Sequence, residues 1–241
     1  MGLIVHDGRD LATRLCEKKT DLPCPRQALA TKPACPQNAA MPTLDHETKA
    51  RQAGMPIVAG IDEAGRGPLA GPLSVAAVIL PPDFHHPLLN DSKALSEKKR
   101  ERLYEELTQR PDVHWHAELI SAQEIDQLNI LQATWQGMRR CAMAISPRPD
   151  CVLIDGKPVR DFPLPQVALV GGDALSFSIA AASIIAKVRR DRLMLELAQT
   201  HPGYGFEIHK GYPTAMHLEA LRRLGPCPLH RRSFGPVKAL L

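Results

Sequence analysis

Four carboxylates in this sequence stand at or just beyond the ends of short apolar segments that are typical of buried strands. They are Asp62, Glu63, Asp155 and Asp173. Ligands in α/β sheets collect where strand ends and their loops converge, so neighbouring strands would place all four acids in one cleft. Two like charges about 4 Å apart repel by roughly 4 kcal/mol at an effective dielectric near 20. Such a cluster is stable when it takes up protons or binds a cation.

The donor atoms of these acids favour a hard divalent ion. Carboxylate oxygens without a His or Cys partner suit Mg²⁺ or Mn²⁺ better than zinc. Two such ions can activate a water molecule and stabilise the leaving oxygen in phosphodiester hydrolysis, so we predict Mn²⁺ or Mg²⁺ as the cofactor. The alternative is ordinary turn chemistry, because acids and glycines are common at strand ends. Acids at three successive strand ends weaken that alternative.

Glycine, aromatic and basic residues near these acids suggest a polyanionic ligand. The triplet Gly65-Arg66-Gly67 lets the backbone approach a phosphate or a sugar, and its arginine can make a charge-assisted bond to phosphate. Near the carboxyl end, aromatic side chains that could stack on bases or sugars alternate with basic ones that could hold phosphates. These residues are Tyr204, Phe206, His209, Lys210 and Tyr212. Each segment taken alone is also typical of a turn or of ordinary surface.

Hydrophobic periodicity and capping residues predict the elements that position these side chains. Apolar or alternating runs predict five strands, at residues 57–61, 73–80, 113–119, 151–154 and 167–170. Caps and helical spacing predict four helices, at residues 97–109, 121–145, 175–199 and 214–224. This order predicts an α/β fold, a mixed sheet flanked by helices, with a helical carboxyl-terminal region.

The first 55 residues lack both helical and alternating periodicity. Their apolar content is largely alanine, so we expect a disordered extension at 1–55 before a catalytic domain at 56–241. Met41 and Met55 also leave open a start further along the chain. The extension carries no apolar core of the signal-peptide type, which indicates a cytoplasmic protein.

Composition excludes several classes of protein and permits a nucleic-acid partner. No run approaches the roughly 20 apolar residues that a bilayer requires, so we expect no membrane association. The six cysteines form no Cys-x-x-Cys pair, which gives no indication of a zinc module or a redox site. Lys and Arg number 30 against 26 for Asp and Glu, a mild positive excess that permits a polyanion without requiring one.

From about residue 57 to its carboxyl end, the chain resembles bacterial type 2 ribonuclease H (ribonuclease HII). The resemblance begins with Ala59-Gly-Ile-Asp-Glu-Ala-Gly-Arg-Gly-Pro-Leu-Ala-Gly-Pro72. It continues in order through blocks at 91–93, 95–100, 125–130, 153–156, 172–173, 178–187, 204–206, 209–214 and 230–236. It implies a ribonuclease H-like fold and metal-dependent cleavage of RNA in RNA–DNA hybrids. It also implies cleavage 5′ to single ribonucleotides embedded in duplex DNA. We expect the protein to be a monomer, although the sequence does not give its oligomeric state.

The same resemblance assigns roles to individual residues. The metals would be held by Asp62, Glu63, Asp155 and Asp173. Gly65, Arg66 and Gly67 would sense the 2′-hydroxyl at the RNA-to-DNA junction, and Lys93 of the Asp-Ser-Lys motif would bind substrate. The tyrosine that packs against the junction sugar would be Tyr212, with Tyr204 as the alternative match.

Two positions depart from the family pattern, and two other functions remain open. Gly171 and Leu175 stand where the family often has basic residues, which predicts weaker substrate binding with the acids intact. One alternative function is a junction-resolving nuclease on the same fold. The other is a catalytically silent protein that binds RNA–DNA hybrids, against which the complete set of acids argues.

Overall fold

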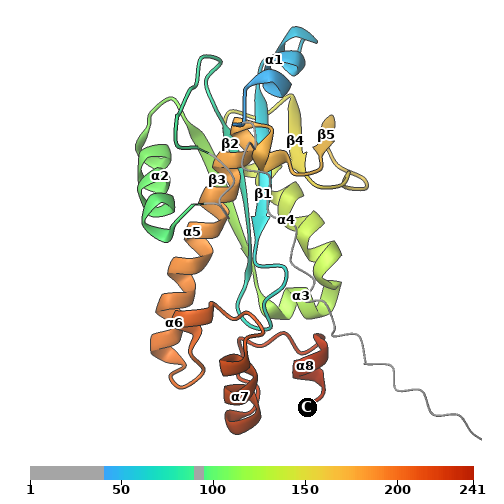
Figure 1. The fold of residues 1–241 in the computed structure, drawn as a ribbon. Helices are drawn as coiled ribbons and strands as arrows, with labels where there is room; N and C mark the ends of the chain where they lie inside the picture. The colour runs from blue at the N-terminus through green and yellow to red at the C-terminus, as the bar shows by residue number, and fades with distance from the viewer. Residues whose placement is uncertain (1–40, 90–94) are drawn as a thin grey trace, which may run out of the picture. The chain divides into compact units, whose positions relative to one another are not determined.

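The computed structural model describes residues 41–89 and 95–241 (Figure 1). Within them, a mixed sheet runs in the order β3-β2-β1-β4-β5, which confirms the predicted α/β class. Its central strand pairs antiparallel with β2 and parallel with β4, β3 pairs antiparallel with β2, and β5 pairs parallel with β4. The strands are β1 (Val58–Ala64), β2 (Leu73–Ile79), β3 (His114–Ile120), β4 (Cys151–Asp155) and β5 (Gln166–Leu169).

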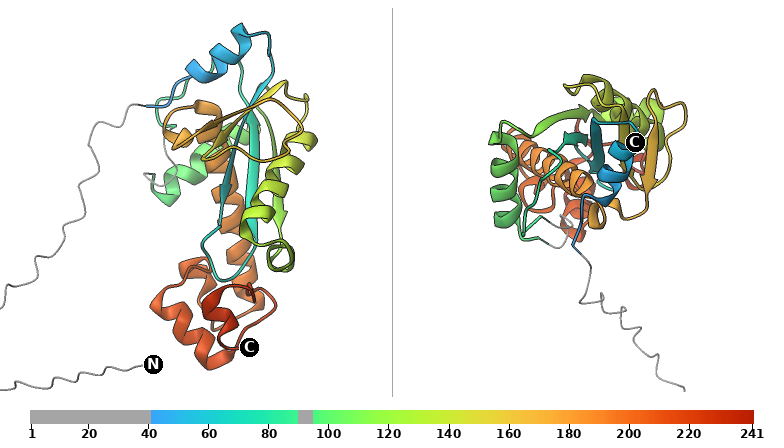
Figure 2. Two further views of the ribbon diagram at one scale, coloured as in Figure 1. Left: turned by 90° about the vertical axis from the view of Figure 1, so that its right-hand side faces the viewer. Right: turned by 90° about the horizontal axis from the view of Figure 1, so that it is seen from above.

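Helices cover both faces of the sheet because its central strands are apolar on both sides. Alternate residues of β2 enter two separate cores: Ala76 and Val78 pack with α5 (Phe177–Thr200), and Val75 and Ala77 pack with α4 (Ile130–Ala144). The two helices therefore lie on opposite faces (Figure 2). On the α5 face, α2 (Glu97–Gln109) packs beside α5, and its predicted bounds are confirmed.

A glycine brings α5 unusually close to the central strand. A Cβ added at Gly60 of β1 would lie 2.2 Å from the carbonyl carbon of Ser178 in α5. No side chain larger than hydrogen fits there without moving the helix or the strand. The close approach places the first turn of α5 directly against β1, two residues before Asp62.

The predicted helix at 121–145 is wrong as a single element. The structure has α3 (Ala122–Leu128) and then α4, separated at Asn129, whose φ of 66° lies outside the helical region. The Asn129 side chain accepts hydrogen bonds from the backbone N–H groups of Leu131 at 3.0 Å and Gln132 at 3.1 Å, so it caps the second helix. The capping box that Ser121 forms with Glu124 at the start of α3 is confirmed.

The prediction of disorder is also wrong for residues 41–55, which contain α1 (Asp45–Gln52). The side chain of Glu47 is fully buried, and its Oε1 accepts from Ser176 Oγ at 2.6 Å, Ser178 Oγ at 2.5 Å and Ser178 N at 3.0 Å. These bonds fasten α1 to the amino-terminal end of α5. The expectation for residues 1–40 lies outside the described part of the chain.

The carboxyl-terminal region is helical, as predicted, and docks on the loop between β1 and β2. It comprises α6 (Phe206–His209), α7 (Ala215–Leu224) and α8 (Gly235–Lys238), beyond the end of α5 (Figures 1 and 2). The N–H groups of Leu69 and Gly71 donate to the carbonyls of Gly211 at 2.8 Å and Leu229 at 2.9 Å. None of the helices in the described residues combines the length and the apolar character that crossing a bilayer would require.

Candidate active site

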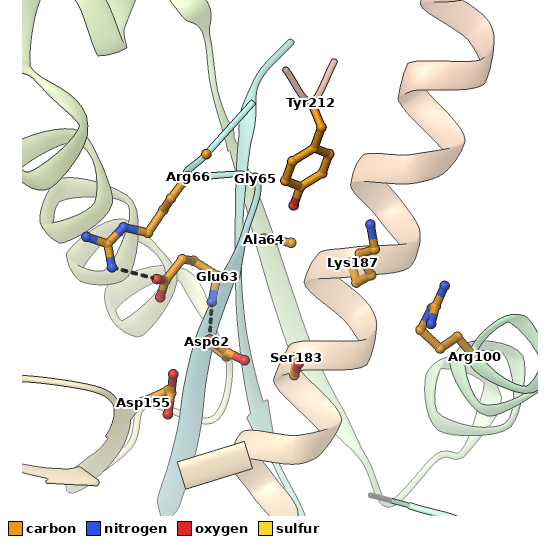
Figure 3. A pocket seen from close by; sticks show the side chains of 11 residues that line it. Asp62, Glu63, Ala64, Gly65, Arg66, Arg100, Asp155, Ser183, Lys187 and Tyr212 are labelled. Atoms are coloured by element: carbon orange, nitrogen blue, oxygen red, sulfur yellow. Dashed lines mark hydrogen bonds and ion pairs between the residues drawn. The ribbon is translucent and has the colours of Figure 1, made fainter. Parts of the chain in front are cut away.

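The parallel strands β1, β4 and β5 bring the predicted acids to one edge of the sheet. Ile61 of β1 pairs with Ile154 of β4, and both face the core beneath α4. The next residue of each strand, Asp62 and Asp155, therefore lies on the α5 side, in adjacent register. Figure 3 shows Asp62 directed toward Ser183 of α5.

The fourth acid follows β5 on a short 3₁₀ turn, η1 (Gly172–Ala174). The N–H of Gly172 donates to Asp155 Oδ1 at 2.7 Å and so ties the turn that carries Asp173 to the end of β4. Asp173 is itself buried. It does not line the cavity described below, but it lies close enough to raise the pKa of the Asp62 carboxyl.

Asp62 shows that the four acids form one electrostatic group. Only 4% of the residue is exposed, and burial, Glu63, Asp155 and Asp173 all raise its pKa well above the ordinary value of an aspartate. An opposing influence comes from the Glu63 N–H, which donates to Asp62 Oδ1 at 2.6 Å. The structure thus brings together all four acids that the sequence analysis selected.

A cavity of about 390 Å³ opens beside these acids, between β1 and α5 (Figure 3). Cationic side chains face the acids across it, namely Lys187 of α5 and Arg100 of α2. Arg66 also lines the cavity, and its Nη1 lies 3.2 Å from Glu63 Oε1. A space with anions on one wall and cations on the other suits a phosphodiester whose charge is shared between bound cations and basic side chains.

Two buried arginines support the glycine triplet at the rim of this cavity, Arg231 through hydrogen bonds and Arg190 through contact with Gly65. Arg231 donates to the carbonyls of Gly65 at 2.6 Å, Arg66 at 3.0 Å and Gly71 at 3.0 Å. Burial, with a smaller effect from Arg190, lowers the pKa of Arg231 to about 9. A Cβ added at Gly65, where φ is +98°, would lie 2.1 Å from Arg190 Nε. The turn therefore rests directly on charged groups that are withdrawn from solvent.

The structure distinguishes the two candidate tyrosines. The ring of Tyr212 lies at the opposite end of the cavity from Asp155 (Figure 3), with Lys187 Nζ 5.8 Å from its centroid. Tyr204 is buried in the carboxyl-terminal core, where its hydroxyl donates to the Gly225 carbonyl at 2.7 Å and its ring stacks on Phe206. The geometry therefore places Tyr212, rather than Tyr204, where a ligand can reach it.

Several residues of the cavity were outside the set that the sequence analysis selected. Ser183 and Lys187 are four residues apart on α5, a spacing that puts both on one helix face. If one of them had been assigned to the site, this spacing would have indicated the other as well. Nothing in the sequence distinguishes the buried Arg190 and Arg231 from the more exposed arginines beside them. Of the predicted contacts, Lys93 lies outside the described residues.

The two departures from the family pattern lie at the surface. Gly171 is exposed with a φ of +69°, and no atom of the described residues lies within 4 Å of a Cβ added there. Leu175 is 44% exposed. Open space surrounds both positions, but the left-handed backbone at Gly171 would be strained by any side chain. Weaker substrate binding stays a prediction.

The four acids fit a divalent cation by donor type and charge. Hard carboxylate oxygens are ligands that Mg²⁺ and Mn²⁺ accept, and a bound cation would relieve the repulsion that raises the Asp62 pKa. Within residues 41–89 and 95–241, no three His, Cys, Asp or Glu side chains already stand as a metal-binding group. The argument that these residues suit a divalent cation therefore rests on their carboxylate oxygens and on the repulsion between the four acids.

Comparisons with known proteins agree on one family. Residues 59–237 match the family model described as Ribonuclease HII. Ribonuclease HII of Endomicrobium trichonymphae is 53% identical over 185 residues, which cover 76% of this chain and 88% of that relative. A ribonuclease HII of Bacillus cereus is 50% identical over 196 residues, which cover 81% of this chain and 76% of that relative.

Among solved structures, the fold is similar to that of the ribonuclease H2 from Pyrococcus horikoshii OT3. The TM-score is 0.66 at 26% sequence identity, over 76% of this chain and 96% of that chain. The region that matches the family model contains the four acids and all but the outermost residue of β1 and of α8.

Proposed function

This chain belongs to the ribonuclease HII family and is a ribonuclease H type endoribonuclease, and we propose that it cuts both the RNA of RNA–DNA hybrids and single ribonucleotides embedded in duplex DNA. One observation carries the proposal. Three acids raise the pKa of a fourth, buried carboxyl at one end of a cavity, and Tyr212 and the Gly65–Gly67 turn line the other end. This arrangement supports metal-dependent hydrolysis beside a surface that can contact a sugar.

The acids would hold the cofactor, and the basic residues would hold the substrate. Two Mg²⁺ or Mn²⁺ ions at Asp62, Glu63, Asp155 and Asp173 would supply an activated water and charge stabilisation for the leaving oxygen. Lys187 and Arg100 face the acids across the cavity and would bind phosphates of the nucleic acid. Their positive charge would keep the scissile phosphate close to the acids despite the negative charge of both.

Recognition of the ribonucleotide would depend on the rim. The 2′-hydroxyl is the group that distinguishes RNA from DNA at a single position, and it can both donate and accept a hydrogen bond. Backbone groups of Gly65, Arg66 and Gly67 are rigid enough to select it, because Arg231 fixes the carbonyls of the first two. The exposed face of Tyr212 would pack against the adjoining sugar.

The direct test is cleavage of a DNA duplex that carries one ribonucleotide, with Mn²⁺, Mg²⁺ or EDTA. We expect metal-dependent incision 5′ to the ribonucleotide that leaves a 3′-hydroxyl, no incision of the all-DNA duplex, and loss of incision by Asp62→Asn. A four-way DNA junction serves as the control for a junction-resolving enzyme. Cutting of the junction in preference to the ribonucleotide duplex would refute the proposal, as would incision by Asp62→Asn at the wild-type rate.

Other expectations remain proposals of the same kind. We propose a cytoplasmic monomer whose catalytic domain includes α1 as well as the elements from β1 to α8, since α1 packs on α5. Size-exclusion chromatography with light scattering would test the monomer.

A further inference from the structure

Two histidines in the carboxyl-terminal core form a hydrogen-bonded chain that ends on the backbone of Tyr212. His230 and His217 meet through their Nε2 atoms at 3.1 Å, and His217 Nδ1 lies 2.9 Å from the Tyr212 carbonyl oxygen. The two residues are 2% and 0% exposed, respectively. Neither ring lines the cavity that holds the acids.

A backbone N–H fixes the position of every proton in this chain. The Cys227 N–H points at His230 Nδ1 at 3.0 Å, and since an N–H can only donate, Nδ1 must accept. The proton of His230 therefore sits on Nε2 and is donated to His217 Nε2. His217 must then carry its own proton on Nδ1, where it donates to the Tyr212 carbonyl. Each ring is a neutral tautomer assigned from its partners.

The surroundings keep both rings neutral. A second proton on either ring would set two N–H groups against each other, at 3.0 Å from Cys227 N or at 3.1 Å between the rings. Burial lowers the pKa of His217, and burial together with His217 lowers that of His230 to about 4. The titratable groups that face the pair are Tyr204, His209, His201 and Cys227.

Apart from this chain, the Tyr212 backbone is held within the described residues by short-range bonds. Its N–H donates to the His209 carbonyl at 2.9 Å, and its carbonyl accepts from the Thr214 N–H at 2.8 Å as well as from His217. Just before it, Gly211 has a φ of +83°, and a Cβ added there would lie 2.3 Å from the Ala70 carbonyl oxygen. Tyr212 is 39% exposed, and its hydroxyl makes no hydrogen bond to any residue that the structure describes.

We propose that His230 and His217 act as positioning residues that set the direction of Tyr212 over the cavity through this tautomer-locked chain. The proposal rests on the proposed function, because it assumes that the Tyr212 ring contacts the ribonucleotide. Neither histidine touches the substrate or the acids. Their contribution is to fix one carbonyl, and with it the backbone from which the ring projects.

The first test needs no activity. With ¹⁵N-histidine-labelled protein and no metal, long-range ¹H–¹⁵N NMR reports which nitrogen of each ring carries the proton. We expect His217 as the Nδ1–H tautomer, the minority form of free histidine in water, and His230 as the Nε2–H tautomer. A proton on Nε2 of His217, or a charged ring at pH 8, would overturn the proposal.

The second test separates positioning from packing. His217→Leu retains bulk but removes the donor, whereas His217→Asn places an amide N–H near the position of Nδ1. For cleavage of the single-ribonucleotide duplex, we expect His217→Leu to lower kcat/KM at least tenfold, mainly through KM. His217→Asn should stay within threefold of the wild type.

A double-mutant cycle with Tyr212 completes the design. In a Tyr212→Ala background, His217→Leu should change kcat/KM by less than twofold, because the group it positions is already gone. An unchanged tenfold loss in that background would refute the proposal and assign His217 to general stability. If the wild type cuts no ribonucleotide substrate, the proposed function fails while the NMR result still decides the tautomer chain.

Discussion

Neutralising Asp62 should stabilise the metal-free protein while it abolishes cleavage. Burial first, and then Glu63, Asp155 and Asp173, disfavour the ionised form of this carboxyl in the folded chain and raise its pKa. Asp62→Asn removes the charge but retains an oxygen that can accept from the Glu63 N–H, which lies 2.6 Å from Oδ1 in the native protein. The substitution therefore isolates the electrostatic cost of the cluster.

The size of the effect follows from Coulomb's law. Two like charges about 6 Å apart repel by about 3 kcal/mol at an effective dielectric near 20. Screening and relaxation reduce the sum over three neighbours, so we expect the free energy of unfolding to rise by about 2 kcal/mol at pH 8 in EDTA. For a chain of this size, that corresponds to an increase of about 4 to 8 °C in Tm.

The pH dependence supplies an internal check. Because folding raises the Asp62 pKa, the stability that this group contributes is complete below its unfolded pKa and is lost as pH rises through the folded value. The wild type carries the penalty at pH 8, and the variant does not. The advantage of Asp62→Asn should therefore shrink toward zero near pH 4.

Urea unfolding of both proteins at pH 8 and pH 4, in EDTA and with Mn²⁺, measures these differences. Asp126→Asn is the matched control, because the Asp126 carboxylate accepts hydrogen bonds from Arg232 N at 2.8 Å and Ser233 N at 2.9 Å. Neutralising this carboxylate should lower the free energy of unfolding by about 1 kcal/mol. Mn²⁺ should stabilise the wild type more than Asp62→Asn. A variant less stable than the wild type at pH 8 in EDTA would refute the electrostatic reasoning.

Three further changes test other parts of the structure. Gly65→Ala should reduce cleavage at least tenfold, because its Cβ would lie 2.1 Å from Arg190 Nε, whereas Gly235→Ala, whose Cβ would meet no described residue beyond its chain neighbours within 4 Å, should retain most activity. Similar rates for the two would contradict this account. Glu47→Ala should lower the free energy of unfolding by about 3 kcal/mol in urea titrations, since it leaves the buried hydroxyls of Ser176 and Ser178 without their acceptor; an effect under about 0.5 kcal/mol would count against the α1 anchor. Because folding lowers the His230 pKa to about 4, stability should fall as pH decreases from about 6.5 to about 4, by at most about 3 kcal/mol; His230→Gln should flatten that slope, and an unchanged slope would argue against a neutral buried ring.

The acids and the sheet could be predicted because both follow local rules. Apolar runs identify β1, β4 and β5, and parallel neighbours necessarily bring their carboxyl ends to one edge. The same rules could not locate the break at Asn129, because apolar helical periodicity continues through it. They missed Glu47 for a different reason: its importance comes from two serines that lie about 130 residues away in sequence.

The supporting arginines and the choice of tyrosine needed coordinates. Arg190 and Arg231 lie in basic stretches that would normally be solvated, and only tertiary packing shows that backbone carbonyls surround them. Tyr204 and Tyr212 occupy similar aromatic and basic surroundings in sequence. Their difference, one ring in a core and one over a cavity, depends on how the carboxyl-terminal helices dock on the β1–β2 loop.

The contact between Gly60 and α5 has a consequence for the whole enzyme. One continuous helix carries Ser183 and Lys187 at the acids and Arg190 beneath the glycine turn, and from Ser183 to Arg190 it rises about 10 Å. Gly60 leaves no room for a side chain against Ser178. Sliding α5 along β1 would therefore bring the helix against the side chain of Val58 or Asp62, the next residues on the same face of the strand. The spacing between the acids and the glycine turn is thereby built into a single rigid segment.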